Sequence, residues 1–422
     1  MTRTFQTISV IGLGYVGLPT AAMFASRGLS VIGVDINERA VARVQAGEAH
    51  FVEPDLDIVM RAVVTAGNLR AVTVPEPADA FLIAVPTPIR PDHTADLSAV
   101  ESALDSIAPV LKRGDLVIIE STCPVGTTAR AAERLRQARP DLSLPDDSPE
   151  ASDILLTYCP ERILPGQTLR ELVDNGRTFG GLDRRSAVAA RDLYSLFARG
   201  EMRLTTAPTA ELSKLVENAF RDVNVAFANE LSIVCEAMKL DVWSVIDLAN
   251  LHPRVNILAP GPGVGGHCIP VDPWFIHEAL PEQTPLIRTA REVNDSKPAH
   301  ITERVAAVAA RFRDPTIAVL GLTYKPNVDD LRESPALKVA RDLAQREIGR
   351  LLIVEPHVAA LPSGLGNCDR VETATLQEAT ARADIVVILV AHNKFRSLDR
   401  GALNHKIVVD TVGLLSAPQA SA

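Results

Sequence analysis

The segment TISVIGLGYVG, residues 7–17, decides the fold of the first part of the chain. A short β-branched run ends in Gly12-Leu-Gly14-Tyr-Val-Gly17, and a helical pattern follows. In a strand–turn–helix unit of this kind, the first glycine makes the tight turn and the second lets the backbone approach a pyrophosphate. The third lets the helix pack on the strand, and N–H groups at the helix start face the phosphates. The segment therefore predicts a dinucleotide-binding unit.

An acidic residue at the end of the next strand favours NAD over NADP as the dinucleotide. Asp35 closes the run VIGVDI, eighteen residues beyond Gly17. A carboxylate at this place binds the ribose hydroxyls and repels a 2′-phosphate. We expect NAD to be held by this turn and strand end, through Gly12, Gly14, Tyr15, Val16, Gly17 and Asp35.

Two further strand ends carry polar residues at the edge of the sheet where ligands bind. Thr87 follows one apolar run and Thr122 follows the next. Threonines here can also cap helices or close turns. Because ligands of open α/β sheets bind at the carboxyl ends of strands, we favour cofactor contact for both.

The order of apolar runs along the chain predicts the fold class and the domains. Continuous apolar strands alternate with helices in the first part and again from residue 316 onward, which is typical of parallel sheets covered on both faces. Between them lies a long helix, from about Thr209 to Lys239. We predict an α/β protein with two Rossmann-like, doubly wound domains joined by this helix and a helical dimerisation region. The predicted domains are 1–205, 206–305 and 306–422.

Composition excludes several classes of protein. A chain of 422 residues with 47% hydrophobic and 23% charged residues has globular composition. A net charge of −9 argues against nucleic acid or an anionic membrane as the main partner. The chain enters a strand almost at once, and its longest apolar runs are about half of the roughly 20 residues that a membrane span needs. We expect a cytoplasmic protein.

One face of the long helix carries polar residues. Glu211, Lys214, Asn218 and Arg221 fall on one narrow arc, opposite a broad apolar stripe. A solvated polar face is the ordinary interpretation. The width of the apolar stripe instead favours a helix buried on most sides, in which Lys214 has a partner or a task.

A loop rich in glycine and proline, residues 260–272, carries the most reactive side chain in the sequence. Cys268 lies in it and Asp272 follows four residues later. Free cysteines are more often small buried hydrophobes, an interpretation that fits Cys235, but the polar, glycine-rich surroundings favour a nucleophilic thiolate at Cys268. His267 could join Cys268 in a metal site, yet no further ligands follow at zinc spacing, so we expect no metal.

A charged segment leaves the first strand of the third domain. It contains Lys325, Arg332 and the Ser334-Pro335 start of a helix. These residues predict either an anion site or an ordinary charged loop, and spacing does not decide between the two.

Together these segments resemble the UDP-glucose/GDP-mannose dehydrogenase family over essentially the whole chain. The motifs stand in the family's order: GLGYVGLP (12–19), ESTCPVGTT (120–128), the K-x-x-x-N pair of the long helix, GGHCIPVD (265–272) and YKPNVDDLRESP (324–335). TYCPERILPG (157–166) and LHPRVNILAPGPGVGGHC (251–268) are similar to the branch that oxidises UDP-N-acetyl-D-mannosamine.

The resemblance implies a reaction and the residues that carry it. The implied reaction is the oxidation of a sugar C6 alcohol to a carboxylate with two NAD, through an aldehyde and a cysteine-bound thioester, for polysaccharide biosynthesis. Cys268 would attack the aldehyde, Lys214 would accept a proton or stabilise oxyanions, and Asn218 would add a donor. Asp272 and Glu161 are both candidates to activate the hydrolytic water.

The resemblance also implies the substrate contacts and a homodimer along the long helix. Arg332 would reach toward NAD, and His252 and Arg254 would come from the neighbouring subunit. The implied contacts of the UDP-sugar are Arg162, Ile163, Lys214, Asn218, Arg221, His252, Arg254, Gly265 and Lys325. Val412 stands where relatives usually have a basic residue, so a substrate contact there is lost or replaced.

Three alternatives remain at this stage. One is the same chemistry on UDP-N-acetylglucosamine or UDP-glucose. Another is a non-catalytic nucleotide-sugar sensor, against which the presence of Cys268, Lys214 and Asn218 together speaks. The third is a simple 3-hydroxy-acid dehydrogenase, which needs neither a nucleophilic cysteine nor a third domain.

Overall fold

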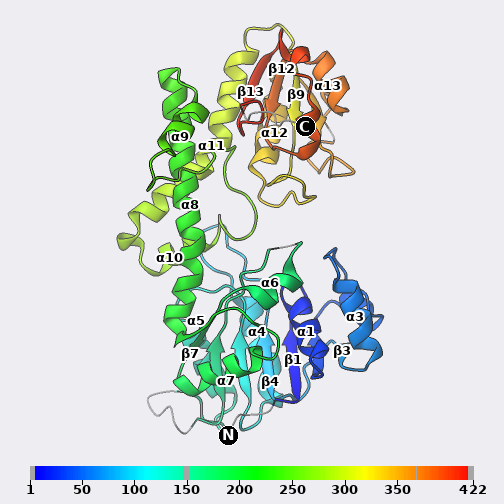
Figure 1. The fold of residues 1–422 in the computed structure, drawn as a ribbon, viewed down its shortest axis with the longest axis vertical. Helices are drawn as coiled ribbons and strands as arrows, with labels where there is room; N and C mark the ends of the chain where they lie inside the picture. The colour runs from blue at the N-terminus through cyan, green and yellow to red at the C-terminus, as the bar shows by residue number, and fades with distance from the viewer. Residues whose placement is uncertain (1–4, 146–151, 165, 367, 417–422) are drawn as a thin grey trace. The chain divides into compact units, whose positions relative to one another are not determined.

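Figure 1 shows a computed structural model of the chain, which describes residues 5–145, 152–164, 166–366 and 368–416. The chain forms two compact units, Met1–Val216 and Glu217–Ala422. The long helix α8 (Ala207–Met238) belongs to both. The finer predicted division at residues 205 and 305 stays a prediction.

The first unit is built on one large sheet of buried strands. From β3 to β6 all neighbours are parallel, and β7 pairs with β6 antiparallel and with β8 parallel. Chain order reverses between β1 and β4, where a doubly wound sheet binds its ligand. The spatial order is β3 (Leu69–Val72), β2 (Ser30–Val34), β1 (Thr7–Ile11), β4 (Ala80–Ile83), β5 (Leu116–Ile119), β6 (Leu155–Tyr158), β7 (Arg177–Gly181) and β8 (Met202–Thr206).

Helices cover both faces of this sheet, because its strands are apolar on both sides. Two apolar clusters, one on each face, join strands to helices. The first cluster holds α1 (Gly17–Ser26), α2 (Glu38–Gln45), α3 (Leu56–Thr65), α6 (Thr168–Asp174) and α7 (Arg184–Tyr194). The second holds α4 (Ser98–Ile107) and α5 (Thr127–Ala138). The predicted doubly wound fold is confirmed here.

The second unit carries a smaller parallel sheet of the same kind. Its chain order reverses between β9 and β12, and apolar clusters again fill both faces. Helices α11 (Pro285–Ala309) and α12 (Pro335–Gln345) pack on one face and α13 (Leu376–Arg382) on the other. The spatial order is β11 (Val371–Thr373), β10 (Arg350–Val354), β9 (Thr316–Leu320), β12 (Ile385–Ile388) and β13 (Ile407–Asp410).

Helix α8 is joined to α11 by buried polar contacts. Arg291 of α11 pairs with Asp222 of α8 at 2.5 Å, and both side chains are almost fully buried. Asn229 and Asn294 join the same two helices by a 2.8 Å hydrogen bond. Buried charges are stable only when paired in this way, so these contacts fix how the two helices lie against each other.

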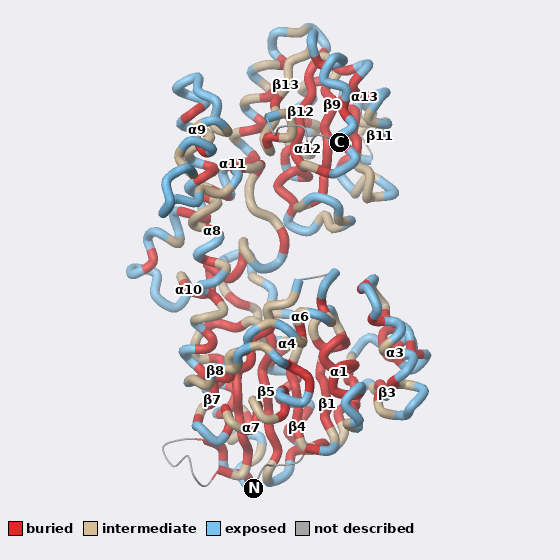
Figure 2. The backbone as a smooth tube through the Cα atoms, viewed as in Figure 1, coloured by how far each residue is buried: buried red, intermediate tan, exposed pale blue. Residues whose placement is uncertain are grey.

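The expectation that α8 is buried on most sides is wrong for the single chain. Figure 2 shows a partly exposed helix, and its apolar stripe faces solvent at Leu212, Val216, Phe220 and Phe227, with Phe220 73% exposed and Phe227 57%. Lys214 is only half-buried. A helix whose apolar stripe is wide but uncovered indicates an interface with another molecule.

Glu211 belongs neither to a solvated face nor to the reactive groups. Its carboxylate is fully buried in the first unit and accepts hydrogen bonds from Gly126 N (2.6 Å) and Thr128 N (2.7 Å) and from the Thr128 hydroxyl (2.6 Å). The acceptor thus lies at the N-terminus of α5, where backbone N–H groups lack helical partners. Glu211 holds the start of α8 against the start of α5.

In the described part of the chain, every helix is too short or too polar to cross a lipid bilayer.

Glu211→Ala should destabilise the first unit by about 3 kcal/mol, because the half-buried N–H of Gly126 and the buried N–H and hydroxyl of Thr128 lose their charged acceptor. Glu133→Ala, on the exposed side of α5, is the matched control and should cost less than about 1 kcal/mol. Urea unfolding followed by circular dichroism measures both free energies. Equal effects of the two substitutions would contradict the capping role.

Candidate active site

The glycine turn after β1 has the geometry that its sequence predicts. Gly12 has a φ of +91°, and a Cβ there would lie 2.5 Å from the carbonyl oxygen of Ala84. A Cβ on Gly17 would lie 1.9 Å from the carbonyl oxygen of Gly12. A side chain on Gly12 would collide with Ala84, just after β4, and a side chain on Gly17 would collide with the carbonyl oxygen of Gly12. Both positions therefore require glycine.

The middle glycine of the turn differs from the other two. A Cβ on Gly14 would meet no atom within 4 Å, which leaves open space beside the backbone at the start of α1. Tyr15 next to it is 46% exposed, and the centres of the Tyr15 and Phe51 rings lie 4.2 Å apart. Val16 is half-buried. The open space beside Gly14 leaves room for a pyrophosphate at the N-terminus of α1.

Asp35 is oriented by the backbone around it. Its Oδ2 accepts from Leu13 N at 2.9 Å and its Oδ1 from Asn37 N at 2.8 Å. The first bond ties the end of β2 to the glycine turn, so the carboxylate stands beside the proposed pyrophosphate position. That is the arrangement a ribose-binding acid requires.

Thr87 and Thr122 are hydrogen-bonded to each other. The Thr87 hydroxyl donates to the Thr122 carbonyl oxygen at 2.6 Å, which links the segments after β4 and β5. This is the turn-closing role that the sequence left open. Cofactor contact by either residue stays a prediction.

Glu161 is held by a buried arginine in the first unit. Its Oε2 lies 2.7 Å from Nη2 of Arg177, and both side chains are almost fully buried. Its Oε1 accepts from Arg162 N at 2.7 Å. The sequence analysis did not predict a role for Arg177. An arginine at the start of the buried strand β7 could have indicated that a buried carboxylate pairs with it.

A second buried carboxyl lies in the same cluster. Glu120, at the end of β5, is hydrogen-bonded to the Tyr194 hydroxyl of α7. Burial first, and the neighbouring Glu161 carboxylate second, raise the pKa of Glu120 to about 7. Burial also raises the pKa of Cys159, in the same cluster, to about 12, so this thiol is inert near neutral pH.

In the second unit, Cys268, Asp272 and Asn218 are brought together. The Cys268 side chain is exposed, and the N–H of Asp272 donates to the Cys268 carbonyl oxygen at 2.9 Å. Asp272 is buried at the first residue of α10 (Asp272–Ala279), where the helix dipole favours a carboxylate. Its Oδ2 accepts from Asn218 Nδ2 at 2.6 Å. By contrast Cys235 is buried, as expected.

Lys214 and Asn218 lie one turn apart on α8, so they share a face of the helix. Both are half-buried, and Arg221 is exposed.

His252 and Arg254 are exposed in the loop after α9 (Val242–Ala249), in a run of exposed residues that includes Leu251. Arg162 and Ile163 are half-buried, and Ile163 packs against the apolar cluster on the first sheet.

The glycine-rich loop before Cys268 packs closely on the segment that carries Lys325. A Cβ on Gly265 would lie 2.5 Å from the carbonyl oxygen of Glu333 and 2.8 Å from Cβ of Tyr324. Lys325 Nζ lies 5.5 Å from the centre of the Tyr324 ring.

Arg332 is exposed and pairs with Asp330 at 2.7 Å, and its contact with NAD stays a prediction. Val412 packs against the apolar cluster of the second sheet.

A buried histidine holds the Lys325 segment in place. His392 follows β12 and is fully buried. Its Nδ1 accepts from Asn327 N at 3.0 Å, and its Nε2 lies 3.3 Å from Glu355 Oε2 and 3.3 Å from the Thr323 hydroxyl. The Thr323 hydroxyl in turn donates to the Lys325 carbonyl oxygen at 2.9 Å. The sequence offered no motif for this network, because its members are far apart in the chain.

Comparison with known proteins decides the family. Three family models match the chain: the NAD binding domain of the UDP-glucose/GDP-mannose dehydrogenase family over residues 6–198, its central domain over 208–296 and its UDP binding domain over 318–417. The chain belongs to the UDP-glucose/GDP-mannose dehydrogenase family. It is therefore an NAD-dependent UDP-sugar dehydrogenase, as its motifs predict.

Two curated relatives match this dehydrogenase over nearly its whole length. The NDP-N-acetyl-D-galactosaminuronic acid dehydrogenase of Ralstonia nicotianae is 56% identical over 99% of this chain and 98% of its own. The UDP-N-acetyl-D-mannosamine dehydrogenase of Yersinia pestis is 53% identical over 97% of this chain and 99% of its own.

Solved structures of similar dehydrogenases share the fold. The UDP-D-ManNAc dehydrogenase of Pyrococcus horikoshii has a TM-score of 0.86 at 37% identity, covering 99% of this chain and 97% of that one. The UDP-N-acetyl-mannosamine dehydrogenase of Staphylococcus aureus has a TM-score of 0.86 at 40% identity, and the match covers 98% of this chain and 96% of that one.

His392→Leu should raise the KM of this dehydrogenase for its UDP-sugar about ten-fold, because the Lys325 segment loses its anchor, while the KM for NAD stays unchanged. His392→Asn, whose amide oxygen can take the place of Nδ1 as acceptor for Asn327 N, should restore most of the affinity. Initial rates of NADH formation give both constants. Equal loss with leucine and asparagine would contradict the anchoring role.

Proposed function

We propose that this chain oxidises the C6 alcohol of UDP-N-acetyl-D-mannosamine to the carboxylate of UDP-N-acetyl-D-mannosaminuronate. The observation that carries the proposal is the placement of Cys268 beside Asp272 and Asn218, in a chain that matches a UDP-N-acetyl-D-mannosamine dehydrogenase over 97% of its length. The reaction consumes one water and two NAD, and each NAD accepts one hydride from C6.

Cys268 makes the second oxidation possible. Its exposed thiolate adds to the C6 aldehyde and forms a thiohemiacetal, whose remaining C–H can be lost as hydride. That oxidation leaves a thioester. Water then adds to the thioester carbonyl, the C–S bond breaks and the carboxylate is released, with Cys268 regenerated.

Lys214 and Asn218 stabilise the oxygen at C6. The oxygen bears negative charge as alkoxide in the first oxidation and as oxyanion in each tetrahedral intermediate. A lysine and an amide donor one turn apart on α8 present a cation and an N–H to the same region. In the first oxidation the neutral Lys214 amine takes the hydroxyl proton and so becomes the ammonium that stabilises the alkoxide.

Asp272 activates the hydrolytic water. It lies next to Cys268 in the same unit, and its hydrogen bond from Asn218 orients the carboxylate. Glu161 is already engaged at one oxygen by Arg162 N and at the other by Arg177. We therefore assign Glu161 the role of shaping the Arg162–Ile163 segment and Asp272 that of positioning the water.

In this proposal, lysine and arginine side chains and the backbone at Gly265 contact the UDP-sugar. In the second unit the proposed contacts are Arg221, Gly265 and Lys325, the last held by the His392 network. In the first unit they are Arg162 and Ile163. The family resemblance implies a basic residue at the position of Val412. This chain instead has a half-buried apolar side chain there, packed against the core of the second sheet, so that contact is absent from the proposed set.

A homodimer completes the proposal. The exposed stripe of Leu212, Val216, Phe220 and Phe227 on α8 is covered by the same stripe of a second copy, as an isologous contact requires. His252 and Arg254, in the exposed run after α9, reach the partner's substrate. The cytoplasm is the proposed location, because five free cysteines are typical of a reducing compartment.

The name of one relative supports a second candidate substrate. The relative from Ralstonia nicotianae is named for a galactosaminuronic acid and is 56% identical to this chain. UDP-N-acetyl-D-galactosamine keeps the acetamido group and the C6 alcohol, and differs in the configuration at C2 and C4. The same residues can oxidise it.

Purified protein should release NADH with UDP-N-acetyl-D-mannosamine at a kcat/KM at least ten-fold above that with UDP-N-acetyl-D-galactosamine, UDP-N-acetylglucosamine or UDP-glucose. Absorbance at 340 nm follows the reaction. The reverse preference for the galactosamine substrate would move the assignment to the second candidate, and no turnover on any of the four would overturn the proposed function.

Cys268→Ser should lower acid formation by at least about 10³-fold, because serine is not ionised at neutral pH and cannot form a thioester. Mass spectrometry of the products separates aldehyde from acid. Cys235→Ser is the matched control and should keep full activity, since that thiol is buried on α8. Normal acid formation by Cys268→Ser would rule out the covalent mechanism.

Phe220→Ser should convert the dimer to a monomer, since it places a hydroxyl in the centre of the α8 stripe. Ile58→Ser, at a 71% exposed position on α3, should leave the dimer intact. Sedimentation velocity measures both. A native protein that sediments as a monomer would contradict the proposed interface.

A further inference from the structure

Asn229 is a fully buried polar residue of α8 to which the proposed reaction gives no part. Both ends of its side-chain amide are hydrogen-bonded within the second unit. Oδ1 accepts from Gly261 N at 2.8 Å, and Nδ2 donates to Asn294 Oδ1 of α11 at 2.8 Å. A buried amide whose two ends are both satisfied specifies one arrangement of the segments that it joins. Here those segments are α8, α11 and the start of the loop that carries Cys268.

The Asn229 amide belongs to a chain of hydrogen bonds that runs in one direction. Asn294 Nδ2 donates to Asp222 Oδ1 at 2.8 Å, and the same carboxylate is paired with Arg291. An ionised carboxylate only accepts hydrogen bonds, and a backbone N–H only donates them. With Asp222 at one end and Gly261 N at the other, each of the two asparagine amides fits in one orientation only.

The loop after Gly261 lies against the same part of α11. Pro298 inside α11 has no N–H, so the helix supplies no donor four residues on for the Asn294 carbonyl oxygen. A Cβ on Gly263 would lie 3.1 Å from that oxygen and 3.4 Å from Cδ of Pro298. The loop thus passes α11 where the proline interrupts its hydrogen bonds, and a glycine permits the close approach.

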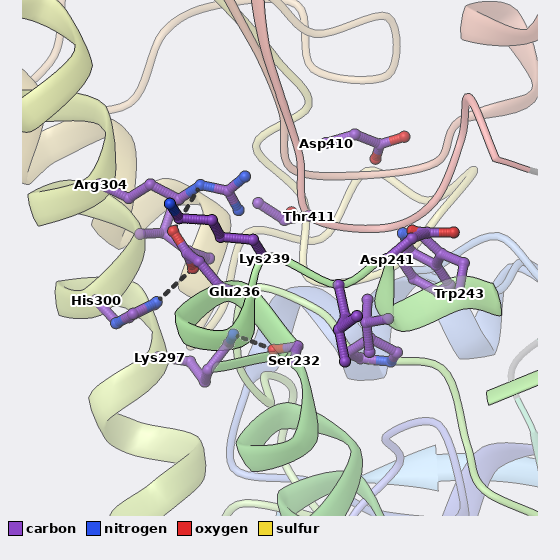
Figure 3. Close-up of a pocket in the computed structure, with 14 residues that line it drawn as sticks. Ser232, Glu236, Lys239, Asp241, Trp243, Lys297, His300, Arg304, Asp410 and Thr411 are labelled. Carbon is purple, nitrogen blue, oxygen red and sulfur yellow. Dashed lines mark hydrogen bonds and ion pairs between the residues drawn. The ribbon is translucent and has the colours of Figure 1, made fainter. Parts of the chain in front are cut away.

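A second bridge supports the same turn of α8. Figure 3 shows Lys297 of α11 beside Ser232 of α8, where Nζ donates to the hydroxyl at 2.7 Å. The Ser232 hydroxyl donates in turn to the Asn229 carbonyl oxygen at 2.6 Å. Both the side chain and the backbone of Asn229 are therefore connected to α11.

Close contacts continue along the loop from Gly261 toward the thiol. Gly266 has a φ of +90°, and a Cβ there would lie 3.0 Å from the Tyr324 ring. Cys268 follows two residues later. Because the glycines of the loop pack closely on their neighbours, a displacement at the start of the loop carries through to the thiol.

We propose that Asn229 is a positioning residue for the Cys268 thiol. Asn294 and Asp222 hold its amide in the required orientation. The inference rests on the proposed two-step oxidation, in which only the second step needs the thiol. Loss of the bond to Gly261 should therefore slow the second oxidation about ten-fold, whereas the first hydride transfer and the KM for NAD stay unchanged.

Two substitutions of Gly261 isolate this hydrogen bond at the loop. A Cβ there would meet no atom within 4 Å, and the φ of Gly261 lies outside the left-handed region, so a side chain has room. Gly261→Pro removes the N–H, and the matched control Gly261→Ala keeps it. In single-turnover reactions with UDP-N-acetyl-D-mannosamine and NAD, the proline variant should form acid about ten-fold more slowly, with aldehyde accumulating. The alanine variant should stay within about two-fold of native protein.

Asn229→Leu removes the other partner of the same bond and should also slow acid formation at least ten-fold. Because Asn229→Leu and Gly261→Pro break one shared interaction, the double variant should be no slower than Asn229→Leu alone. Losses that multiply in the double variant would overturn the proposal. Equal rates in the proline and alanine variants of Gly261 would overturn it as well.

Hydrogen exchange of the full chain provides a readout that does not depend on the reaction. Gly261→Pro should raise the exchange rates of amides in residues 263–272 several-fold, while α8 keeps its protection. Unchanged protection of the loop in the proline variant would contradict the positioning role. If native protein oxidises no UDP-sugar, the proposed function fails, but the exchange result still decides whether Asn229 holds the loop.

Discussion

The loop that carries Cys268 has no regular secondary structure of its own, so its position depends on hydrogen bonds from outside. Helix α8 supplies two of them: Asn229 Oδ1 accepts from Gly261 N at 2.8 Å, and Asn218 Nδ2 donates to Asp272 at 2.6 Å. Both asparagines lie on a helix that the buried Arg291–Asp222 pair fixes against α11. The reactive thiol is therefore placed by a helix that it does not belong to.

Local groups, rather than total charge, explain how an acidic chain binds anions. The net charge is −9, yet the groups proposed to bind the anionic ligands include the N-terminus of α1 and Lys214 in the first unit and Lys325 in the second. A charge acts over a Debye length of about 8 Å at physiological salt, so nearby cations and helix termini outweigh distant carboxylates.

The sequence predicted what local patterns encode. Apolar strands, the glycine turn with Asp35 and the Cys268 loop follow from residues close in the chain, and both doubly wound sheets were found where expected. Contacts between distant residues escaped prediction: Glu211 at α5, Arg177 at Glu161 and His392 at the Lys325 segment. The apolar stripe of α8 was predicted correctly as apolar but wrongly as covered within the single chain, because periodicity does not tell which molecule covers a face.

The central claim is that one site performs two successive oxidations through Cys268. The most direct test is the ratio of NADH formed to UDP-sugar consumed, with limiting UDP-N-acetyl-D-mannosamine and excess NAD. NADH is measured by absorbance and the remaining sugar by chromatography. The account predicts two NADH per sugar, with no aldehyde accumulating. A ratio of one, with the aldehyde as the end product, would contradict it.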